Sequence, residues 1–381
     1  MKIIHVWHHY WPFIGGLENA VKFLAEGMAR CDHEVHVITS AYGAKDIPKE
    51  EEVNGVYIHR VKAVRIKYPD LTLPREIPMN VLREADAVHG HSQGSLFTLR
   101  ILEEAKKHDV KTVMYFMAID AFEDHPNPLI RLLAPYYGRW ALRKAVMISD
   151  IKLVRSRRDE EILKKRYGIE ALYVPDGIPR ELLEKPSMVK DFRNKYGVYE
   201  PFVVYVGRLH RLKGVNVLIK AMSIVIKEAP ELKAVIIGPG DQRPYMSLAR
   251  RLGVEKNVLF LGFVNEDTKI GAIDASLALV LPSACDYVEV YPMVISEAWA
   301  RGKPVIATAV GGIPYRIKHR VNGLLVPPRN PHALADAIIE LYNNRNLAER
   351  LGKEGRKEIH TWDEIANKLI DIYKSLGYME V

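Results

Sequence analysis

Residues 202–221 have the sequence FVVYVGRLHRLKGVNVLIKA, and this stretch decides the class of fold. It begins with the consecutive apolar residues Phe202–Val206, a pattern typical of strands covered on both faces. A basic, glycine-containing loop follows, and the next segment places Val217, Leu218 and Ala221 on one side of a helix. A strand, a loop and a helix in this order form the repeating unit of a parallel α/β sheet.

The same alternation of short apolar runs and helical segments extends along the whole chain. In the first half the expected strands are Lys2–Trp7, Glu34–Thr39, Val56–Lys62, Ala87–Gly90, Thr112–Phe116, Lys152–Arg155 and Leu172–Val174. In the second half they are Phe202–Val206, Ala234–Ile237, Val258–Leu261, Leu277–Leu281, Pro304–Ala307 and Gly323–Val326. The sequence therefore predicts an α/β protein with two doubly wound, Rossmann-like sheets and a ligand cleft between the two domains.

The series of strands restarts near residue 200. The turn at residues 174–177 closes the first series, and the stretch 186–200 is charged and poor in strand-forming residues. We therefore expect an N-terminal domain over residues 1–196 and a C-terminal domain over residues 197–360. The helical pattern of residues 361–377 does not by itself assign that segment to either domain.

The composition restricts the class of protein. The chain has 381 residues, of which 48% are hydrophobic and 27% charged, as in soluble globular proteins of two domains. No apolar run reaches the ~18 residues of a membrane span, and the N-terminus lacks the features of a signal peptide. Cys31 and Cys285 are too few to staple the chain, so we expect a cytoplasmic protein. The scarcity of glutamine (Gln93 and Gln242) is compatible with a thermophilic source.

The formal net charge of +8 is unevenly distributed. Eleven Lys or Arg residues stand against four Asp or Glu residues between Arg131 and Arg166. No zipper, zinc-finger or aromatic RNA-binding motif accompanies this charge, so nucleic acid is not an expected partner. An anionic membrane surface, a phosphate-bearing substrate and an ordinary solvated helix face all remain compatible with it.

Two carboxylates, Glu289 and Glu297, give the strongest local signal. Pro292 suits the first turn of a helix, which would leave Glu289 in the preceding loop and place Glu297 inside the helix. The backbone N–H groups of the first turn, those of Met293, Val294 and Ile295, would then face the cleft and suit a phosphate. Carboxylates on either side of a phosphate could accept hydrogen bonds from a sugar and from a ribose.

Other loops supply cations and glycines at the expected ends of strands. Arg208 and Lys213 could neutralise a diphosphate as it becomes a leaving group, although basic loop residues are often merely solvated. Gly16 and Gly238 would permit close approach of the backbone to a ligand, or simply form tight turns. His8 and the adjacent histidine have no acidic or thiol companion at ligand spacing, so no metal site is expected. The elbow of serine hydrolases and the phosphate-binding P-loop are also absent from the sequence.

Together these stretches resemble the retaining glycosyltransferases of family 4, which have the GT-B fold. The resemblance covers nearly the whole chain, and the paired carboxylates with seven residues between them are its most specific part. The other stretches that carry it are Gly15–Glu18, Cys31–Val35, Ala87–Ser92, Val174–Ile178, Gly207–Gly214, Gly311–Pro314 and Asn322–Leu324.

The resemblance implies a nucleoside diphosphate sugar as co-substrate, no cofactor and no divalent metal. Glu289 would hold hydroxyls of the donor sugar, and Glu297 would hold the ribose. Arg208 and Lys213 would stabilise the departing diphosphate. The donor-binding set would also include Gly16 and Gly238, the N–H groups at the start of the helix, and Val264 beside the base. The C-terminal helix would return to the first domain.

Three departures from the family pattern concern the sugar end of the site. Met117 occupies the place of a usual histidine, three positions before Asp120, which completes the predicted catalytic set. Val290 replaces a glycine after the first glutamate, and Tyr315 replaces an acidic residue. The leading hypothesis is sugar transfer to a lipid-linked, saccharide or small-molecule acceptor, with the basic stretch favouring an acceptor at the inner face of a membrane. The alternatives are a disaccharide synthase or nucleotide-sugar epimerase of the same fold, and a catalytically silent nucleotide-sugar binder.

Overall fold

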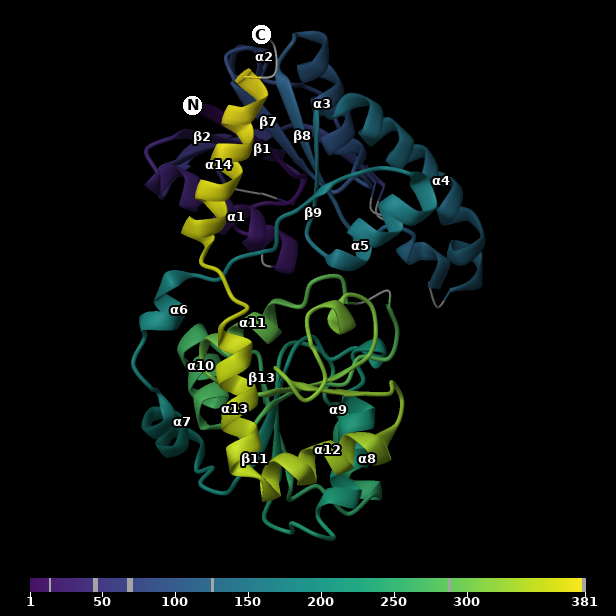
Figure 1. The fold of residues 1–381 in the computed structure, drawn as a ribbon, viewed down its shortest axis with the longest axis vertical. Coiled ribbons are helices and arrows are strands. Elements are labelled where there is room, and N and C mark those ends of the chain that lie inside the picture. The colour runs from purple at the N-terminus through teal and green to yellow at the C-terminus, as the bar shows by residue number, and fades with distance from the viewer. Residues whose placement is uncertain (14, 44–46, 67–70, 125–126, 287–288, 379–381) are drawn as a thin grey trace. The chain divides into compact units, whose positions relative to one another are not determined.

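A computed structural model describes residues 1–13, 15–43, 47–66, 71–124, 127–286 and 289–378 (Figure 1). The chain forms two compact α/β units. Unit 1 comprises Met1–Pro179 with His360–Val381, and unit 2 comprises Arg180–Ile359. Each unit has its own sheet, built mainly of parallel strands, and the predicted pair of Rossmann-like α/β domains is confirmed.

Unit 1 contains an eight-stranded sheet in the order β10-β9-β8-β7-β1-β2-β4-β3. Its strands are β1 (Lys2–Val6), β2 (Glu34–Ser40), β3 (Glu50–Val53), β4 (Val56–Val61), β7 (Ala87–His91), β8 (Lys111–Phe116), β9 (Ile151–Val154) and β10 (Leu172–Tyr173). All neighbours run parallel except β3 and β4, which are antiparallel. A separate antiparallel pair consists of β5 (Ala63–Ile66) and β6 (Leu71–Pro74).

The helices of unit 1 cover this sheet. They are α1 (Gly16–Arg30), α2 (Met79–Leu82), α3 (Leu96–Lys107), α4 (Pro128–Ile148), α5 (Arg157–Ile162) and α14 (Trp362–Tyr378), with a 3-10 helix η1 (Ala121–Asp124) and a π-helical turn η2 (Leu163–Tyr167). The C-terminal helix α14 lies beside α1 (Figure 1), where Arg30 and Asp363 form a salt bridge at 2.6 Å. In the described part of the chain, no helix is long and apolar enough to cross a membrane.

Unit 2 contains a six-stranded parallel sheet in the order β13-β12-β11-β14-β15-β16. Its strands are β11 (Phe202–Val206), β12 (Lys233–Ile237), β13 (Val258–Gly262), β14 (Leu279–Leu281), β15 (Val305–Thr308) and β16 (Leu324–Val326). Its helices are α6 (Arg180–Glu184), α7 (Val189–Tyr196), α8 (Val215–Val225), α9 (Arg243–Arg251), α10 (Glu266–Ala275), α11 (Met293–Ala300), α12 (Pro331–Asn343) and α13 (Arg345–Arg356), with 3-10 turns at Arg211–Lys213 and Ile313–Tyr315.

The division between the units falls after Pro179, earlier than the boundary expected after residue 196. Two contacts account for the difference. Phe192 of α7 is buried in the core of unit 2, and Arg301 donates hydrogen bonds at 2.8 Å to the carbonyl groups of Leu182 and Lys185. The charged stretch that resembles a linker in the sequence is therefore part of unit 2.

Candidate functional site

The predicted donor residues of unit 2 lie on loops at the carboxyl ends of neighbouring strands. Arg208 and Lys213 follow β11, and Glu289 follows β14, which is hydrogen-bonded to β11. Gly311 follows β15, the neighbour of β14 on its other side. Since carboxyl ends of parallel strands meet at one edge of a sheet, these three loops are adjacent.

Glycines at two points allow these loops to touch. Gly214 has a φ of +74°, and a Cβ at this position would lie 1.8 Å from the carbonyl oxygen of Pro282. Gly311 has a φ of +56°, and a Cβ there would lie 2.1 Å from the carbonyl oxygen of Glu289. The N–H of Gly312 donates to that same oxygen at 2.8 Å. Any side chain at these glycines would push the loops apart, so they hold the Glu289 loop in place.

Glu289 lies in a buried cluster of polar groups. Only 2% of its side chain is exposed, and it accepts a hydrogen bond from Nζ of Lys213 at 2.8 Å. The fully buried hydroxyl of Ser283 donates to the same carboxylate oxygen. A buried carboxylate requires such partners because removing an unpaired charge from water is strongly unfavourable. Sequence analysis missed Ser283, which no charge or spacing marks.

The phenol of Tyr205 fixes the backbone of the loop that carries Arg208. Its hydroxyl donates to the Arg208 carbonyl oxygen at 2.9 Å, and the N–H of His210 donates to that oxygen at 3.0 Å. Burial, assisted by the carboxylate of Glu289, raises the pKa of Tyr205 far above its ordinary value, so the hydroxyl remains a donor. The Arg208 side chain itself is exposed. A fixed backbone with an exposed guanidinium suits recognition of an anion.

Glu297 lies inside α11 and faces a lysine of α10. Its carboxylate accepts from Nζ of Lys269 at 2.9 Å, and that ammonium group also contacts Glu266 at 2.8 Å. Burial alone would lower the pKa of Lys269, but the two carboxylates outweigh burial, and the pKa is raised. Lys269 therefore sets the orientation of Glu297. Nothing in the sequence marked this lysine, because it belongs to another helix and to no motif.

Helix α11 begins directly after Pro292, which caps it, so Met293 is the first helical residue. Glu289 and Glu297 accordingly lie before and inside this helix, as predicted. The N–H of Ile295 donates to the Pro292 carbonyl oxygen at 3.2 Å. This differs from the expectation that three N–H groups face an anion. Only those of Met293 and Val294 remain as first-turn groups for that purpose.

Arg316 fixes the start of α11. Its guanidinium donates to the carbonyl of Pro292 at 2.8 Å and to the hydroxyl of Ser296 at 2.6 Å. It also stacks 3.9 Å from the ring centroid of Tyr291. This arginine follows Tyr315, one of the departures from the family pattern, and sequence analysis did not identify it.

Gly238 and Val264 occupy the loops after β12 and β13. Gly238 has a φ of +140°, and its N–H donates to the carbonyl of Gly262 at 2.8 Å. A Cβ at Gly238 would lie 1.9 Å from the carbonyl oxygen of Gly207, so loop packing alone accounts for this glycine. Val264 is partly buried against the core of unit 2.

In unit 1, the carboxylate of Asp120 is already engaged. It forms a salt bridge with Arg166 at 2.6 Å and accepts a hydrogen bond from the hydroxyl of Tyr167 at 2.7 Å. Burial and this bond raise the pKa of Tyr167 to about 12. Gly16 begins α1, and a Cβ at that position would meet open space. The start of α1 is thus sterically accessible.

The segment after β8 has an unusual backbone held by two side chains. The N–H of Met117 donates to Gln93 at 3.0 Å, and the amide of Gln93 donates back to the Met117 carbonyl at 2.8 Å. Ala118 has a φ of +52°, and the N–H groups of Ala118 and Ile119 donate to the buried carboxylate of Asp159 at 3.1 and 3.0 Å. Non-glycine residues in this conformation are concentrated at functional sites. Asp159 was missed by sequence analysis.

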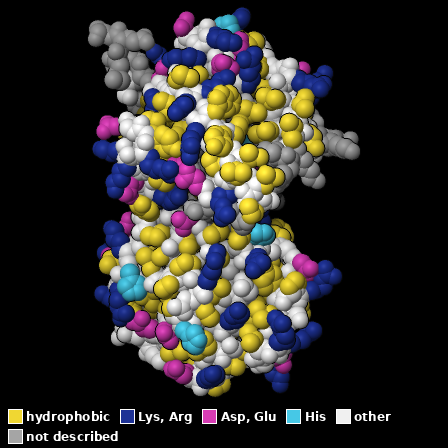
Figure 2. Space-filling model, turned by 90° about the vertical axis from the view of Figure 1, so that its right-hand side faces the viewer, with side chains coloured by type: hydrophobic (Ala, Val, Ile, Leu, Met, Phe, Trp, Pro, Cys, Tyr) yellow, Lys and Arg dark blue, Asp and Glu magenta, His cyan; other side chains and the backbone are white. Residues whose placement is uncertain are grey.

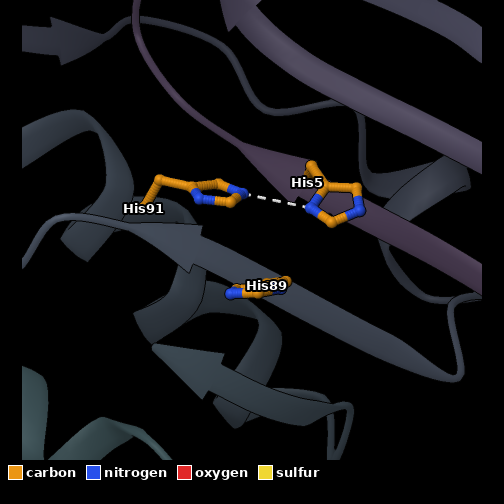
Figure 3. Close-up of side chains that lie close together, drawn as sticks. All are labelled: His5, His89 and His91. Atoms are coloured by element: carbon orange, nitrogen blue, oxygen red, sulfur yellow. Dashed lines mark hydrogen bonds between the residues drawn. The ribbon is translucent and has the colours of Figure 1, made fainter. Parts of the chain in front are cut away.

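Three buried histidines lie close together at the centre of the unit 1 sheet, on β1 and β7 (Figure 3). Nη2 of Arg155 donates to Nδ1 of His91 at 2.9 Å, so Nε2 of His91 carries the proton and donates to Nδ1 of His5 at 3.1 Å. Nε2 of His5 then faces the sulfur of Met28 at 3.3 Å. Burial, assisted by Arg155, lowers the pKa of His5 to about 3 and those of His89 and His91 well below the ordinary value.

These three histidines are the only group among the described residues that could hold a metal ion. The geometry does not favour one, because the rings of His89 and His91 are stacked 4.5 Å apart at 18°. Ring nitrogens bind a metal in the plane of the ring, so nearly parallel rings do not converge on one ion. The neighbouring guanidinium of Arg155 also opposes a cation. Arg155, His91 and His5 form a chain of hydrogen bonds, and the neutral ring of His89 stacks against that of His91.

Both halves of the chain match families of known proteins. Residues 189–358 match the family "Glycosyl transferases group 1", and residues 14–182 match "Glycosyltransferase Family 4". An uncharacterized glycosyltransferase of Methanocaldococcus jannaschii is 30% identical, over 98% of each chain. Sucrose-phosphate synthase from Thermosynechococcus elongatus has the same fold, with a TM-score of 0.78, 23% identity and complete coverage of both chains. Anabaena HepE in complex with UDP-glucose gives a TM-score of 0.77 at 20% identity, over 98% of this chain and 100% of HepE.

Proposed function

The chain belongs to the group 1 and family 4 glycosyltransferases of GT-B fold, and from this premise we propose that it transfers a sugar from a nucleoside diphosphate sugar to an acceptor hydroxyl, with retention of configuration and without a divalent metal. The observation that carries the proposal is the contact between Lys213 and the buried carboxylate of Glu289, at the carboxyl edge of the unit 2 sheet.

The two cations after β11 support the handling of a diphosphate. The ammonium group of Lys213 is fixed by its salt bridge to Glu289, whose loop is packed against glycines. The guanidinium of Arg208 is exposed, but the backbone that carries it is fixed. Cations placed in advance stabilise charge as it develops on a leaving group without reorganisation at the moment of reaction. In this role they supply what a divalent metal supplies in other transferases. The first-turn N–H groups of α11 add to the same field.

The settings of the two carboxylates support separate roles, one in binding the sugar of the donor and one in binding its nucleotide. Glu289 accepts hydrogen bonds in a buried, desolvated place, which suits hydroxyls of the transferred sugar. Glu297 is more exposed and is oriented by Lys269, which suits the ribose, and Val264 lies on the loop assigned to the base. Gly238 shapes the adjoining loop.

The proposed reaction breaks the bond between the anomeric carbon and the diphosphate oxygen. The acceptor oxygen forms the new bond on the same face of the sugar, and its proton passes to the departing diphosphate. Arg208 and Lys213 stabilise the negative charge on that diphosphate.

In unit 1, we assign Asp120 to catalysis and the start of α1 at Gly16 to close approach of the donor phosphates and of the acceptor. The acceptor class that we favour is a lipid-linked one at an anionic membrane surface, because the basic stretch from Arg131 to Arg166 lies in unit 1. Asp120 would act from its salt bridge with Arg166.

A second candidate function is nucleotide-sugar binding without catalysis. It is favoured by Met117, whose thioether occupies the usual position of a histidine and cannot move a proton. This function predicts binding of a nucleoside diphosphate with neither hydrolysis nor transfer of the sugar.

The test is incubation with radiolabelled UDP-glucose and other nucleoside diphosphate sugars, in EDTA, with lipid, saccharide and small-molecule acceptors. We expect a new glycoside whose anomeric proton coupling shows retention. Release of UDP with formation of a free disaccharide or an epimerised sugar would indicate the same-fold alternatives. Nucleotide binding with no product under any acceptor would support the silent binder and contradict the proposal.

A further inference from the structure

Helix α4 has two apolar faces, of which only one is covered. Its inner face carries Ala141, Leu142 and Ala145, which are buried in the core of unit 1. On the opposite side, six apolar side chains recur at helical spacing, and each is between 48% and 75% exposed. They are Leu129, Leu132, Leu133, Tyr136, Trp140 and Met147. At 100° per residue these six positions form one continuous stripe along the helix, which we call the α4 stripe.

Basic side chains accompany the α4 stripe, and the helix contains no acidic residue. The cations in or beside the stripe are Arg139, Arg143 and Lys144, whereas Arg131 points to the other side of the helix. Lys144 pairs with Glu103 at 3.0 Å, and Arg139 lies 3.5 Å from Glu123. The exposed side chain of Arg143 lies on the same face of the helix as the stripe, between Trp140 and Met147. Figure 2 shows hydrophobic side chains gathered together with Lys and Arg on the face of unit 1 over α4.

The chemistry of this face distinguishes between partners. A single convex helix with leucines, a tryptophan, a tyrosine and long cations suits the boundary between lipid head groups and acyl chains. The aromatic rings have one polar end, and the cations can extend toward phosphates while their stems cover apolar surface. A second copy of this chain fits less well, because a stripe-to-stripe contact would bring Arg139 and Arg143 against the same cations of the other copy.

We propose that α4 docks unit 1 on a bilayer containing anionic lipid, with the α4 stripe inserted among the acyl chains and the cations at the phosphates. Insertion of the stripe supplies most of the affinity, since Glu103 and Glu123 already pair with two of the three cations in or beside it. The purpose of the docking rests on the proposed function, because it would hold the enzyme where a lipid-linked acceptor is found. The docking itself can be measured without any sugar transfer.

The experiment is flotation of the full chain with vesicles of phosphatidylcholine, alone or mixed with phosphatidylglycerol. We expect the mixed vesicles to bind the protein more strongly. Leu132→Gln with Leu133→Gln should reduce partitioning into both by at least about 10-fold, since burial of each leucine contributes more than a kcal/mol. Arg143→Gln should reduce binding by about fivefold, and only to the mixed vesicles, as expected for one cation near an anionic surface.

Matched controls carry equivalent changes elsewhere. Tyr199→Gln with Val321→Gln alters two comparably exposed apolar residues of unit 2, and Arg251→Gln removes an exposed cation. These variants should float as the wild type does. Vesicles with brominated acyl chains should quench the wild-type fluorescence, and most of that quenching should be lost in Trp140→Phe.

Two outcomes would overturn the proposal. One is wild-type protein that stays in the aqueous fraction with both vesicles. The other is self-association of the wild type that the paired leucine variant abolishes, which would identify a second copy as the occupant. Thermal shift with UDP is measured in parallel. If UDP does not raise the melting temperature but the protein still floats with vesicles, the proposed function alone is contradicted. If UDP raises the melting temperature but the protein does not float, the docking alone is contradicted.

Discussion

The unit 2 loops around Glu289 and the unit 1 segment around Asp120 each pair a carboxylate with a cation, but they do so in different settings. The Glu289 side chain is 2% exposed, its lysine is 19% exposed, and glycines lock the loops together. The Asp120 side chain is 10% exposed, and its partner Arg166 is 49% exposed. A buried, fixed pair keeps its electrostatic strength, whereas solvent screens an exposed one and its geometry can adapt. The contrast indicates a rigid site in unit 2, where we propose that the donor binds, and a more adaptable one in unit 1, where we propose that the acceptor binds.

The largest expected effect follows from removing the fixed cation. Lys213→Ala should lower kcat by about 10²–10³-fold, as when one preorganised charge-stabilising group is lost. Among the described residues, the hydroxyl of Ser283 is then the remaining side-chain donor to Glu289. Steady-state kinetics would test this, with the exposed Lys220→Ala on α8 as the matched control. Turnover close to that of wild type would show that the rigid pair has no catalytic role.

The two units should also differ in sensitivity to acid. His5, His89 and His91 are buried and neutral in unit 1, with pKa values below the ~6.5 of the unfolded chain. The unfolded chain therefore binds protons that the folded unit does not. Their contribution to stability should be constant above pH ~6.5 and should fall as the pH drops below it, because the unfolded chain then takes up protons that the folded unit excludes.

Calorimetry between pH 7 and pH 4 would measure this effect. We expect the unfolding transition of unit 1 to shift to lower temperature, and His89→Phe, which preserves ring packing, to reduce the slope with pH. Equal slopes for wild type and variant would show that these histidines do not control acid stability.

A smaller effect should distinguish Lys269 as a positioning residue. Lys269→Met removes the partner of Glu297 while keeping the length of the side chain. UDP affinity should fall by about 10-fold, as for loss of a charge-assisted hydrogen bond, with kcat nearly unchanged. Isothermal titration with UDP would test this, with Lys195→Met on α7 as the control. A fall in kcat instead would place Lys269 in the chemical step.

The smallest effect concerns the adaptable pair in unit 1. Asp120→Asn should lower turnover by up to about 10-fold, because the amide keeps one acceptor but loses the charge of the carboxylate, whereas the ion pair with the exposed Arg166 contributes little by itself. Arg166→Gln breaks the same salt bridge but leaves the carboxylate. If Asp120 is catalytic, only its own replacement lowers turnover. Equal losses in the two variants would assign it a structural role.

The fold was largely predictable because its central strands are covered on both faces. All thirteen expected strands are present, since a short run of consecutive apolar residues bounded by turns is typical of a strand buried on both sides. The strands β3, β5 and β6 were missed. β3 has the sequence EEEV at the edge of its sheet, and its charged residues obscure any strand pattern. The domain boundary depended on the burial of Phe192, a tertiary contact that local composition does not reveal.

The sequence singles out residues that belong to a motif and not those that support one. Glu289, Glu297, Arg208 and Lys213 stand in motifs, and the roles that the family resemblance implies for them stay predictions. Their supports were not identified: Ser283, Lys269, Arg316 and Asp159 are single residues on other elements, brought into contact only by folding. The carboxylate of Asp120 was identified, but its salt bridge with Arg166 depends on a contact 46 residues away in sequence.

The division of the donor between Glu289 and Glu297 is the central claim, and one paired measurement tests it most directly. Glu289→Gln and Glu297→Gln would be compared by kcat and by UDP affinity under the same conditions. We predict that the first mainly lowers kcat, by about 10²-fold, and that the second mainly weakens UDP binding, by about 10-fold. Wild-type values for both variants, or the opposite assignment of the two effects, would contradict the account.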